Sequence, residues 1–152
     1  MMGRPDSGRV AAALMLAALT IACESTSPAD PPPDEIEAGT WGGEDAGLIV
    51  NDSVAHVHIG CTLGNFPAPI ALDAGLRFDV AGEYLLRAYP VAQGPMMPAR
   101  LSGVLRGDVL ILSVAVHDTI ENQLVVRGPV TVRRGREPKL GPCPICRSPG
   151  LR

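Results

Sequence analysis

The sequence predicts an all-β fold, a small antiparallel up-and-down β-barrel or sandwich of about seven to eight strands. The composition, with 17 glycines, 15 prolines and only 3% aromatic residues among 152, is typical of a turn-rich β domain. Several short stretches alternate apolar and polar residues, and turn-forming residues separate them over about 95 residues. After Cys23, no stretch keeps a helical period. Of the two all-β architectures, we favour the barrel.

The first 22 residues have the pattern of an export signal. Arg4 and Arg9 give a positive start, and the apolar run Val10–Ala22 follows and ends at a small residue. In a helix this run rises roughly 20 Å, which is less than the ~30 Å hydrocarbon core of a membrane. We therefore expect residues 1–22 to be a signal peptide rather than a membrane span.

Leu19-Thr20-Ile21-Ala22-Cys23 resembles the lipobox of bacterial lipoproteins. The resemblance implies that Cys23 is the mature N-terminus and is lipidated, with palmitate, so that the lipid makes the membrane a partner. Glu24 follows the cysteine in place of the aspartate that favours inner-membrane retention, which implies a cell-envelope location with the outer membrane favoured. Cleavage after Ala22 would instead leave a soluble secreted protein.

Residues 23–38 are expected to be the lipidated cysteine and a disordered linker. Glu24–Ala38 contains four prolines, five acids and a single large aliphatic residue, Ile36. Such a segment buries too little apolar surface to offset the entropy lost on ordering. The three successive prolines at 31–33 favour extended geometry, so the linker would act as a tether.

The folded domain is expected to span residues 39–143, with residues 144–152 as a flexible tail. Turn signals lie at Asn51–Ser53, Ala81–Gly82 and Gly107–Asp108, and the last strand is bent at Gly128–Pro129. Residues 62–74 are interrupted by a glycine and two prolines, which predicts a loop with at most a short edge strand at 70–72. The expected strands are 39–43, 48–51, 55–61, 76–80, 83–88, 100–106, 109–117 and 124–132.

Within these strands the alternation predicts which side chains face the core. Cys61 is expected on the core face of its strand, with Ala55, Val57 and Ile59. The clearest hairpin joins 100–106 to 109–117, and its inward residues are predicted to be Leu101, Gly103, Leu105, Leu110, Leu112, Val114 and Val116. Between strands, the Tyr89–Pro98 segment carries Met96 and Met97, which either plug the end of the core or form an adaptable lid over a ligand pocket.

Gly39-Thr40-Trp41 on the first strand, with Arg133 or Arg134 on the last, resembles the closure of lipocalin-type (calycin) barrels, in which a tryptophan packs under a terminal arginine. The whole 39–143 stretch resembles uncharacterised small bacterial lipoproteins with G-x-W-G-G, a mid-chain cysteine, a G-D hairpin and R-G-x-x-P-x-L-x-x-C, here residues 134–143. The resemblance implies a lipocalin-like barrel and no particular activity. The domain lacks the second lipocalin motif and the late helix, which argues against a wide cavity.

The cysteines predict one disulfide in an oxidising compartment. If Cys23 is lipidated, three cysteines remain, and one of them is left over. We favour Cys61–Cys143, which would fix the tail across a loop of about 80 residues and be worth up to ~4 kcal/mol. A short Cys143–Cys146 bridge competes with it. The C-P-x-C pattern also matches a thioredoxin-type redox motif, but that chemistry needs a helix N-terminus, and none is expected here.

Other candidate sites are weak. His56 and His58 lie two apart on one strand face and are weak candidate metal ligands, to which His117-Asp118 could add. Two histidines on a solvated β face are commoner than a metal site, so no metal is expected. No nucleophile elbow, phosphate loop or paired acids occur at a recognisable spacing, so neither an enzyme nor a cofactor is expected. The net charge is −3, and apart from the basic tail after Val132 the chain has no basic patch typical of nucleic-acid binding, so no nucleic-acid partner is expected.

The sequence therefore predicts a membrane-anchored periplasmic or cell-surface lipoprotein with a non-catalytic binding or structural β-domain. One alternative is a carrier of a small apolar ligand in the barrel, beneath Met96 and Met97. The other is an enzyme, which would require convergent polar groups in a cleft.

Overall fold

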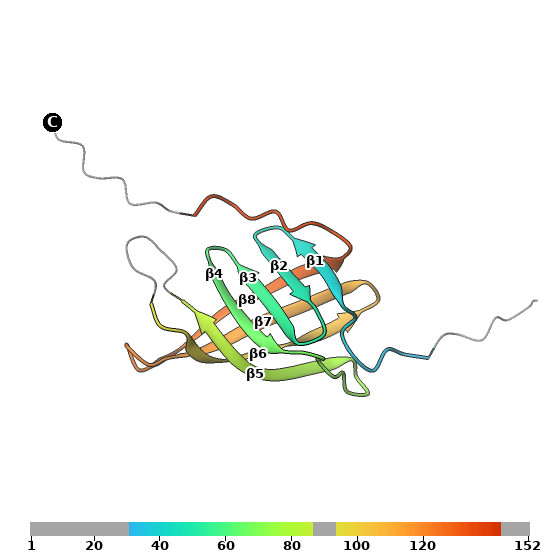
Figure 1. Cartoon of the computed structure of the whole chain (residues 1–152), viewed down its shortest axis with the longest axis horizontal. Coiled ribbons are helices and arrows are strands. Elements are labelled where there is room, and N and C mark those ends of the chain that lie inside the picture. The colour runs from blue at the N-terminus through green and yellow to red at the C-terminus, as the bar shows by residue number, and fades with distance from the viewer. Residues whose placement is uncertain (1–30, 87–93, 144–152) are drawn as a thin grey trace, which may run out of the picture. The chain divides into compact units, whose positions relative to one another are not determined.

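A computed structural model describes residues 31–86 and 94–143; the predicted signal peptide at 1–22, Cys23 and the predicted tail at 144–152 lie outside the described residues. Eight strands pair antiparallel in sequence order, and β8 pairs with β1, so the sheet closes (Figure 1). The predicted all-β, up-and-down barrel is confirmed. The strands are β1 (Gly39–Gly43), β2 (Ala46–Val50), β3 (Val54–Ile59), β4 (Thr62–Pro67), β5 (Arg77–Leu85), β6 (Met97–Arg106), β7 (Val109–Asp118) and β8 (Gln123–Arg134).

Because successive strands run in opposite directions, their connections gather at two ends of the barrel. We call one end the base: it holds the connections 51–53, 68–76 and 107–108. The other end, the mouth, holds the turns 44–45, 60–61 and 119–122. In Figure 1 the base lies to the right and the mouth to the left. Within residues 31–86 and 94–143, no helix is long and apolar enough to cross a membrane.

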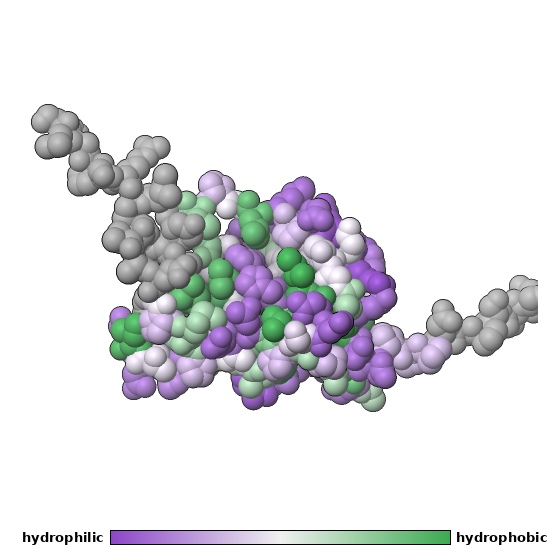
Figure 2. Space-filling model, viewed as in Figure 1, coloured by the Kyte–Doolittle hydropathy of each residue, from purple (hydrophilic) through white to green (hydrophobic). Residues whose placement is uncertain are grey.

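Apolar side chains fill the barrel interior. Trp41, Phe66 and Tyr84 are the largest of them, and each is at most 2% exposed. The predicted hairpin of β6 and β7 is confirmed, and all its predicted inward residues are buried except the partly buried Gly103. The outer surface is mixed: Figure 2 shows hydrophilic residues interspersed among apolar ones on the face in view. The described core is thus a packed interior rather than a lumen.

Two of the interior aromatic rings lie over glycines on neighbouring strands. A Cβ at Gly64 would lie 2.3 Å from the Tyr84 ring, and a Cβ at Gly82 would lie 2.5 Å from the Phe66 ring. Both glycines are therefore needed inside strands, where they leave room for a ring. The predicted loop from residue 62 is wrong for 62–67, because β4 pairs with both β3 and β5. The predicted hairpin turn at Ala81–Gly82 is also wrong, because β5 continues through it and supplies both expected strands, 76–80 and 83–88, as far as Leu85.

The expected strand 55–61 ends earlier than predicted. Gly60 and Cys61 form the turn between β3 and β4, with Gly60 at a φ of 58°. Cys61 is consequently only partly buried, so its placement on the core face is wrong. Its position at the mouth instead leaves the sulfur free to meet another segment.

The end of the expected linker belongs to the barrel. Ile36 is 2% exposed, its N–H donates to the Ile70 carbonyl (2.9 Å), and the Leu72 N–H donates to the Asp34 carbonyl (2.8 Å). The expectation of disorder is therefore wrong for Asp34–Ile36, because one buried isoleucine and a bridge between Glu35 and Ala71 hold this segment across the base. The predicted short edge strand at 70–72 is the other half of this bridge.

Residues 135–143 form what we call the strap, which runs over the outer face of β1 and β2 from base to mouth. The β1 and β8 strands share only the register pairs Trp41–Arg134 and Gly42–Arg133. A Cβ at Gly42 would lie 2.3 Å from the Arg136 carbonyl oxygen, and one at Gly47 would lie 2.5 Å from Pro138. Glycine at these two positions thus allows the strap to cover the short seam.

The strap is fixed along its length. The Lys139 N–H donates to the Gly43 carbonyl (3.0 Å), and the Lys139 ammonium donates to Glu44 (2.8 Å). This hydrogen bond, with the charge of Lys139, lowers the pKa of Glu44. At the mouth, Cys143 forms a disulfide with Cys61, with 5.4 Å between their Cα atoms. The favoured pairing is present in the structure, and Cys146 lies outside the described residues.

Candidate functional site

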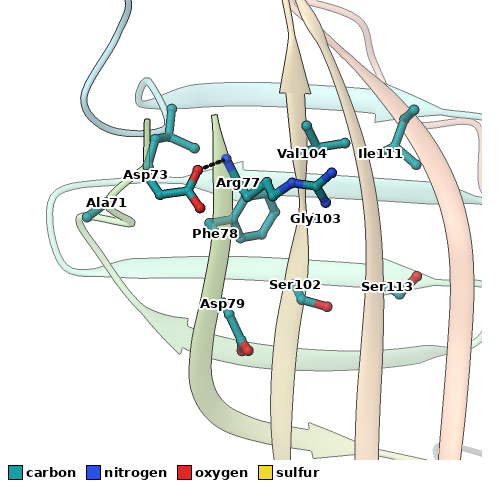
Figure 3. Close-up of a pocket in the computed structure, with 11 residues that line it drawn as sticks. Ala71, Asp73, Arg77, Phe78, Asp79, Ser102, Gly103, Val104, Ile111 and Ser113 are labelled. Atoms are coloured by element: carbon teal, nitrogen blue, oxygen red, sulfur yellow. Dashed lines mark hydrogen bonds between the residues drawn. The ribbon is translucent and has the colours of Figure 1, made fainter. Parts of the chain in front are cut away.

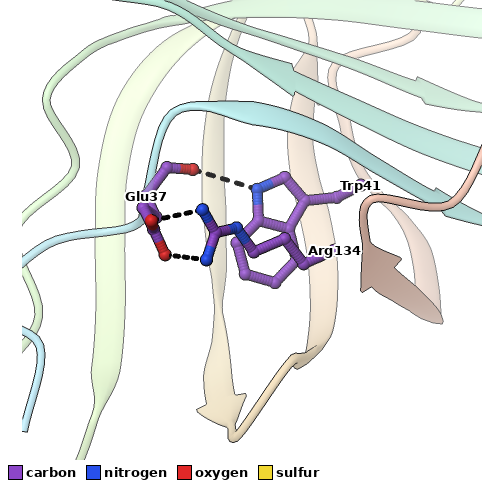
Figure 4. Close-up of polar contacts among 3 residues, drawn as sticks. All are labelled: Glu37, Trp41 and Arg134. Carbon is purple, nitrogen blue, oxygen red and sulfur yellow. Dashed lines mark hydrogen bonds and ion pairs between the residues drawn. The ribbon is translucent and has the colours of Figure 1, made fainter.

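The seam at the base is closed by Glu37, Trp41 and Arg134 (Figure 4). The Trp41 indole N–H donates to the Glu37 carbonyl (3.1 Å), and the Glu37 carboxylate forms an ion pair with the Arg134 guanidinium. Arg134, rather than Arg133, therefore lies opposite the tryptophan, while Arg133 pairs with Asp108. Trp41 is buried and every polar group here has a partner, so this closure is structural.

A groove of about 780 Å³ lies on the outer face of β5, β6 and β7, near the base (Figure 3). Its polar lining includes Arg77 and Asp79 on β5, Ser102 on β6 and Ser113 on β7, and the two serines are register partners. Leu72, Val104 and Ile111 supply apolar walls. The groove is therefore amphipathic, and none of its residues was singled out by the sequence analysis.

The acids of the groove are already engaged. Asp79 accepts a hydrogen bond from the Arg100 side chain (2.8 Å), and Asp73 accepts from the backbone N–H groups of Gly75 and Arg77 (both 2.8 Å). The Arg77 guanidinium, by contrast, has no hydrogen-bond or ion-pair partner among the described residues, and it extends toward β6 in Figure 3. With the two serine hydroxyls it offers hydrogen-bond donors to a ligand rich in acceptors.

The two histidines of β3 interact with each other and with β4. Their rings make an edge contact with 4.9 Å between centroids, and His56 Nδ1 lies 2.6 Å from Asn65 Oδ1. Burial, and then the charge of His56, lower the pKa of His58. His117 is on β7, which is not a neighbour of β3. In the described part of the chain no three His, Cys, Asp or Glu side chains come together as a metal site, so no metal is assigned.

Met97 and Met96 differ in exposure. Met97 begins β6 and is fully buried, so it is part of the core, whereas Met96 is 36% exposed. Residues 89–93 of the expected lid lie outside the described residues. The described methionines therefore fit the plug better than the lid.

The mouth holds polar groups that sequence analysis missed. The Thr62 hydroxyl donates to the Ile59 carbonyl (2.7 Å) and lies 2.8 Å from the Tyr84 hydroxyl. Arg127, on β8, acts on the Tyr84 pKa through its charge. No local sequence pattern marks Arg127, because the register of β7 and β8 turns Arg127 inward and its neighbour Val126 outward.

Comparisons with protein-family models, curated proteins and solved structures find no match to this chain. Two regions then remain as candidate sites: the outer groove of β5–β7 and the mouth.

Proposed function

We propose that this chain is a lipid-anchored protein of the cell envelope whose barrel is a non-catalytic binding module. The observation that carries this proposal is the contrast between a filled interior and a groove on the outer face with unengaged hydrogen-bond donors. The export signal and the lipobox-like sequence at 19–23 support the anchored location. The ligand binds outside the barrel rather than within it.

The packed interior argues for surface binding over transport of an apolar ligand. Carriers enclose their cargo in a cavity of a few hundred cubic ångströms. Here Leu48, Phe66 and Leu112 are among the side chains that occupy that space, each at most 1% exposed. An apolar cargo would have to displace side chains that are packed in contact with each other.

The groove fits a polar, acceptor-rich chain. Arg77 and the hydroxyls of Ser102 and Ser113 supply donors, whereas Val104 and Ile111 supply apolar contact. Because Asp73 and Asp79 are already hydrogen-bonded, the groove favours ligands that accept rather than donate. A glycan of the cell envelope has this chemistry.

The lipid-anchored location is tested by expressing the full chain in a Gram-negative host with labelled palmitate. We expect label in the chain, recovery with membranes, and an N-terminal peptide that begins at modified Cys23. The Cys23→Ala variant should lose the label. A chain that begins at unmodified Cys23 and is recovered as soluble protein would contradict the anchor.

Binding is tested with the mature chain on an array of cell-envelope glycans. The Arg77→Gln variant should lose most of the signal, and Arg106→Gln, an exposed arginine outside the groove lining, should keep it. If native mass spectrometry of the mature chain instead shows a lipid-sized mass that survives removal of detergent, the carrier alternative replaces the module.

A further inference from the structure

A second pocket, of about 440 Å³, lies at the mouth between the barrel and the end of the strap. Arg127 and Thr62 line its barrel side, Cys61 lines it at the disulfide, and Pro142 belongs to the strap. Asp45, from the turn after β1, is the acid among its lining residues. The pocket is separate from the outer groove of β5–β7, with which it shares no lining residue.

Arg127 is positioned by β8 to point into the mouth. It lies opposite Val114 in the register of β7 and β8, and directly opposed residues of antiparallel strands face the same side. Val114 is fully buried, so Arg127 is on the interior side and only partly exposed. The neighbouring Val126, which is apolar, faces outward and is 56% exposed. A strand that faces its valine outward and its arginine inward forgoes burial of an apolar side chain.

One nitrogen of the Arg127 guanidinium has no partner among residues 31–86 and 94–143. Arg127 Nε is buried and has no hydrogen-bond partner, and it is the one side-chain nitrogen or oxygen of this kind within the described residues. No ion pair joins Arg127 to Asp45 or to another described carboxylate. Burying an unpaired donor of a charged group is costly, and natural structures contain few such atoms.

The two nearby hydroxyls, of Thr62 and Tyr84, are hydrogen-bonded within the protein. Thr62 uses its single proton on the Ile59 carbonyl, so the Tyr84 hydroxyl must donate to Thr62 Oγ1. The Tyr84 oxygen then has no proton to give to a ligand unless its hydroxyl turns away from Thr62. Burial raises the pKa of Tyr84, whereas its hydrogen bond with Thr62 and then the charge of Arg127 lower it.

We propose that Arg127 is the binding site for a carboxylate-bearing ligand, held at the mouth between the barrel and the strap. A carboxylate matches the two-pronged guanidinium and satisfies the unpartnered donor. Asp45 in the pocket wall favours a singly charged group over a doubly charged phosphate. The size of the pocket limits the ligand to a small acid or the terminal carboxylate of a peptide, because the packed interior gives an acyl chain no room.

The test is a titration of the mature ¹⁵N-labelled chain with acetate, with chloride and phosphate as comparison anions. NMR follows the backbone amide resonances of Gly60, Thr62 and Gly141, which line the pocket in every variant, and the Nε–H resonance of Arg127 in the wild type. We expect a saturable shift with acetate and weaker shifts with the other two. Arg127→Met should abolish saturation, and Arg127→Lys, which keeps the charge without the planar fork, should weaken binding about tenfold. Asp45→Asn should tighten it about two- to fivefold.

Arg77→Gln is the control, because it alters the outer groove and leaves the mouth unchanged. It should leave acetate binding intact. A failure of acetate to bind at the mouth can therefore be told apart from a failure of glycans to bind in the outer groove. A second titration with a short peptide, with and without an amidated C-terminus, distinguishes a peptide terminus from a free acid. A shift that does not saturate, that persists in Arg127→Met and Arg127→Lys, or that is equal for chloride would overturn the proposal.

Discussion

The base and the mouth of the barrel are closed by different means. At the base, Ile36 and Ile70 are both 2% exposed, and the seam adds the Glu37–Arg134 pair, whose members each have a partner. At the mouth, a covalent bond between Cys61 and Cys143 holds the strap, and Arg127 has a buried nitrogen without a partner. One end is closed by burial, and the other is held by a covalent bond beside an unsatisfied charge.

This difference indicates that the base serves the stability of the fold, whereas the mouth is the candidate for ligand binding. An interface in which every polar group is satisfied can be explained by folding alone. A partly exposed arginine with one buried nitrogen that has no partner among the described residues lowers stability and needs another reason to be there. At the mouth, a ligand would supply the hydrogen-bond partner that Arg127 lacks. At the base, contacts within the chain close the barrel. The following experiments test this division, in order of decreasing expected effect.

The disulfide should make the largest contribution to stability. Cys61 and Cys143 are separated by 82 residues, and closing a loop of this length is worth about 4.5 kcal/mol on the chain-entropy model. The double variant Cys61→Ser, Cys143→Ser should therefore lose up to about this much unfolding free energy in urea. Cys146→Ser should change nothing. A peptide map that joins Cys143 to Cys146 would contradict the account of the mouth.

Ile36→Ala should destabilise the base. The side chain is 2% exposed and belongs to the core cluster, so its removal should cost about 2–4 kcal/mol, the usual range for such truncations. Ile120→Ala, at a 57% exposed position at the mouth, is the matched control and should cost little. Equal urea midpoints for the two variants would mean that Asp34–Ile36 is not part of the folded domain.

Gly42→Ala should displace the strap. The added methyl group would meet the backbone of Arg136 and Glu137 at 2.3 to 2.6 Å, and overpacking of this kind costs roughly 1–3 kcal/mol. Gly141→Ala, in the strap itself, would meet only the Asp45 side chain at 3.7 Å and serves as the control. The stability of both variants is measured by thermal denaturation. A Gly42→Ala protein as stable as Gly141→Ala would show that the strap does not pack on β1.

The smallest effect should be a pH dependence from His58. Its folded pKa lies below 6.5 because of burial and then the charge of His56. The unfolded chain therefore binds more protons in the window just below pH 6.5, so this contribution to stability is complete above that pH and is lost as the pH falls. His58→Gln should flatten the stability profile in this window, whereas His117→Gln, on an exposed position, should not. If His58→Gln left the pH dependence of stability unchanged, the assignment of this dependence to His58 would be wrong.

The fold class and much of the fold could be predicted because the alternation of apolar and polar residues along a strand indicates which side chains are buried. The β6–β7 hairpin follows from seven regularly spaced residues and a Gly-Asp turn, and the pairing of Cys61 with Cys143 follows from the position of each cysteine along the chain. These features are local, or depend on cysteine chemistry alone.

The errors share a physical cause, which is contact between distant segments. Gly64 and Gly82 look like turn residues until the rings of Tyr84 and Phe66 are placed over them. Ile36 looks like part of a solvated linker until Ile70 provides its partner. No local pattern contains either fact. The site at Arg127 was missed for the same reason, because the pairing of β8 with β7 sets which side of β8 faces inward, and the sequence around Arg127 does not show it.

The most direct test of the contrast between base and mouth is the unfolding free energy of Arg127→Met in urea, measured without added carboxylates. A side chain of similar length without charge removes the unsatisfied donor, so we predict a protein as stable as the wild type or more stable by about 1–4 kcal/mol. A loss of more than about 1 kcal/mol would contradict the account, because it would show that Arg127 stabilises the fold through a partner within the protein.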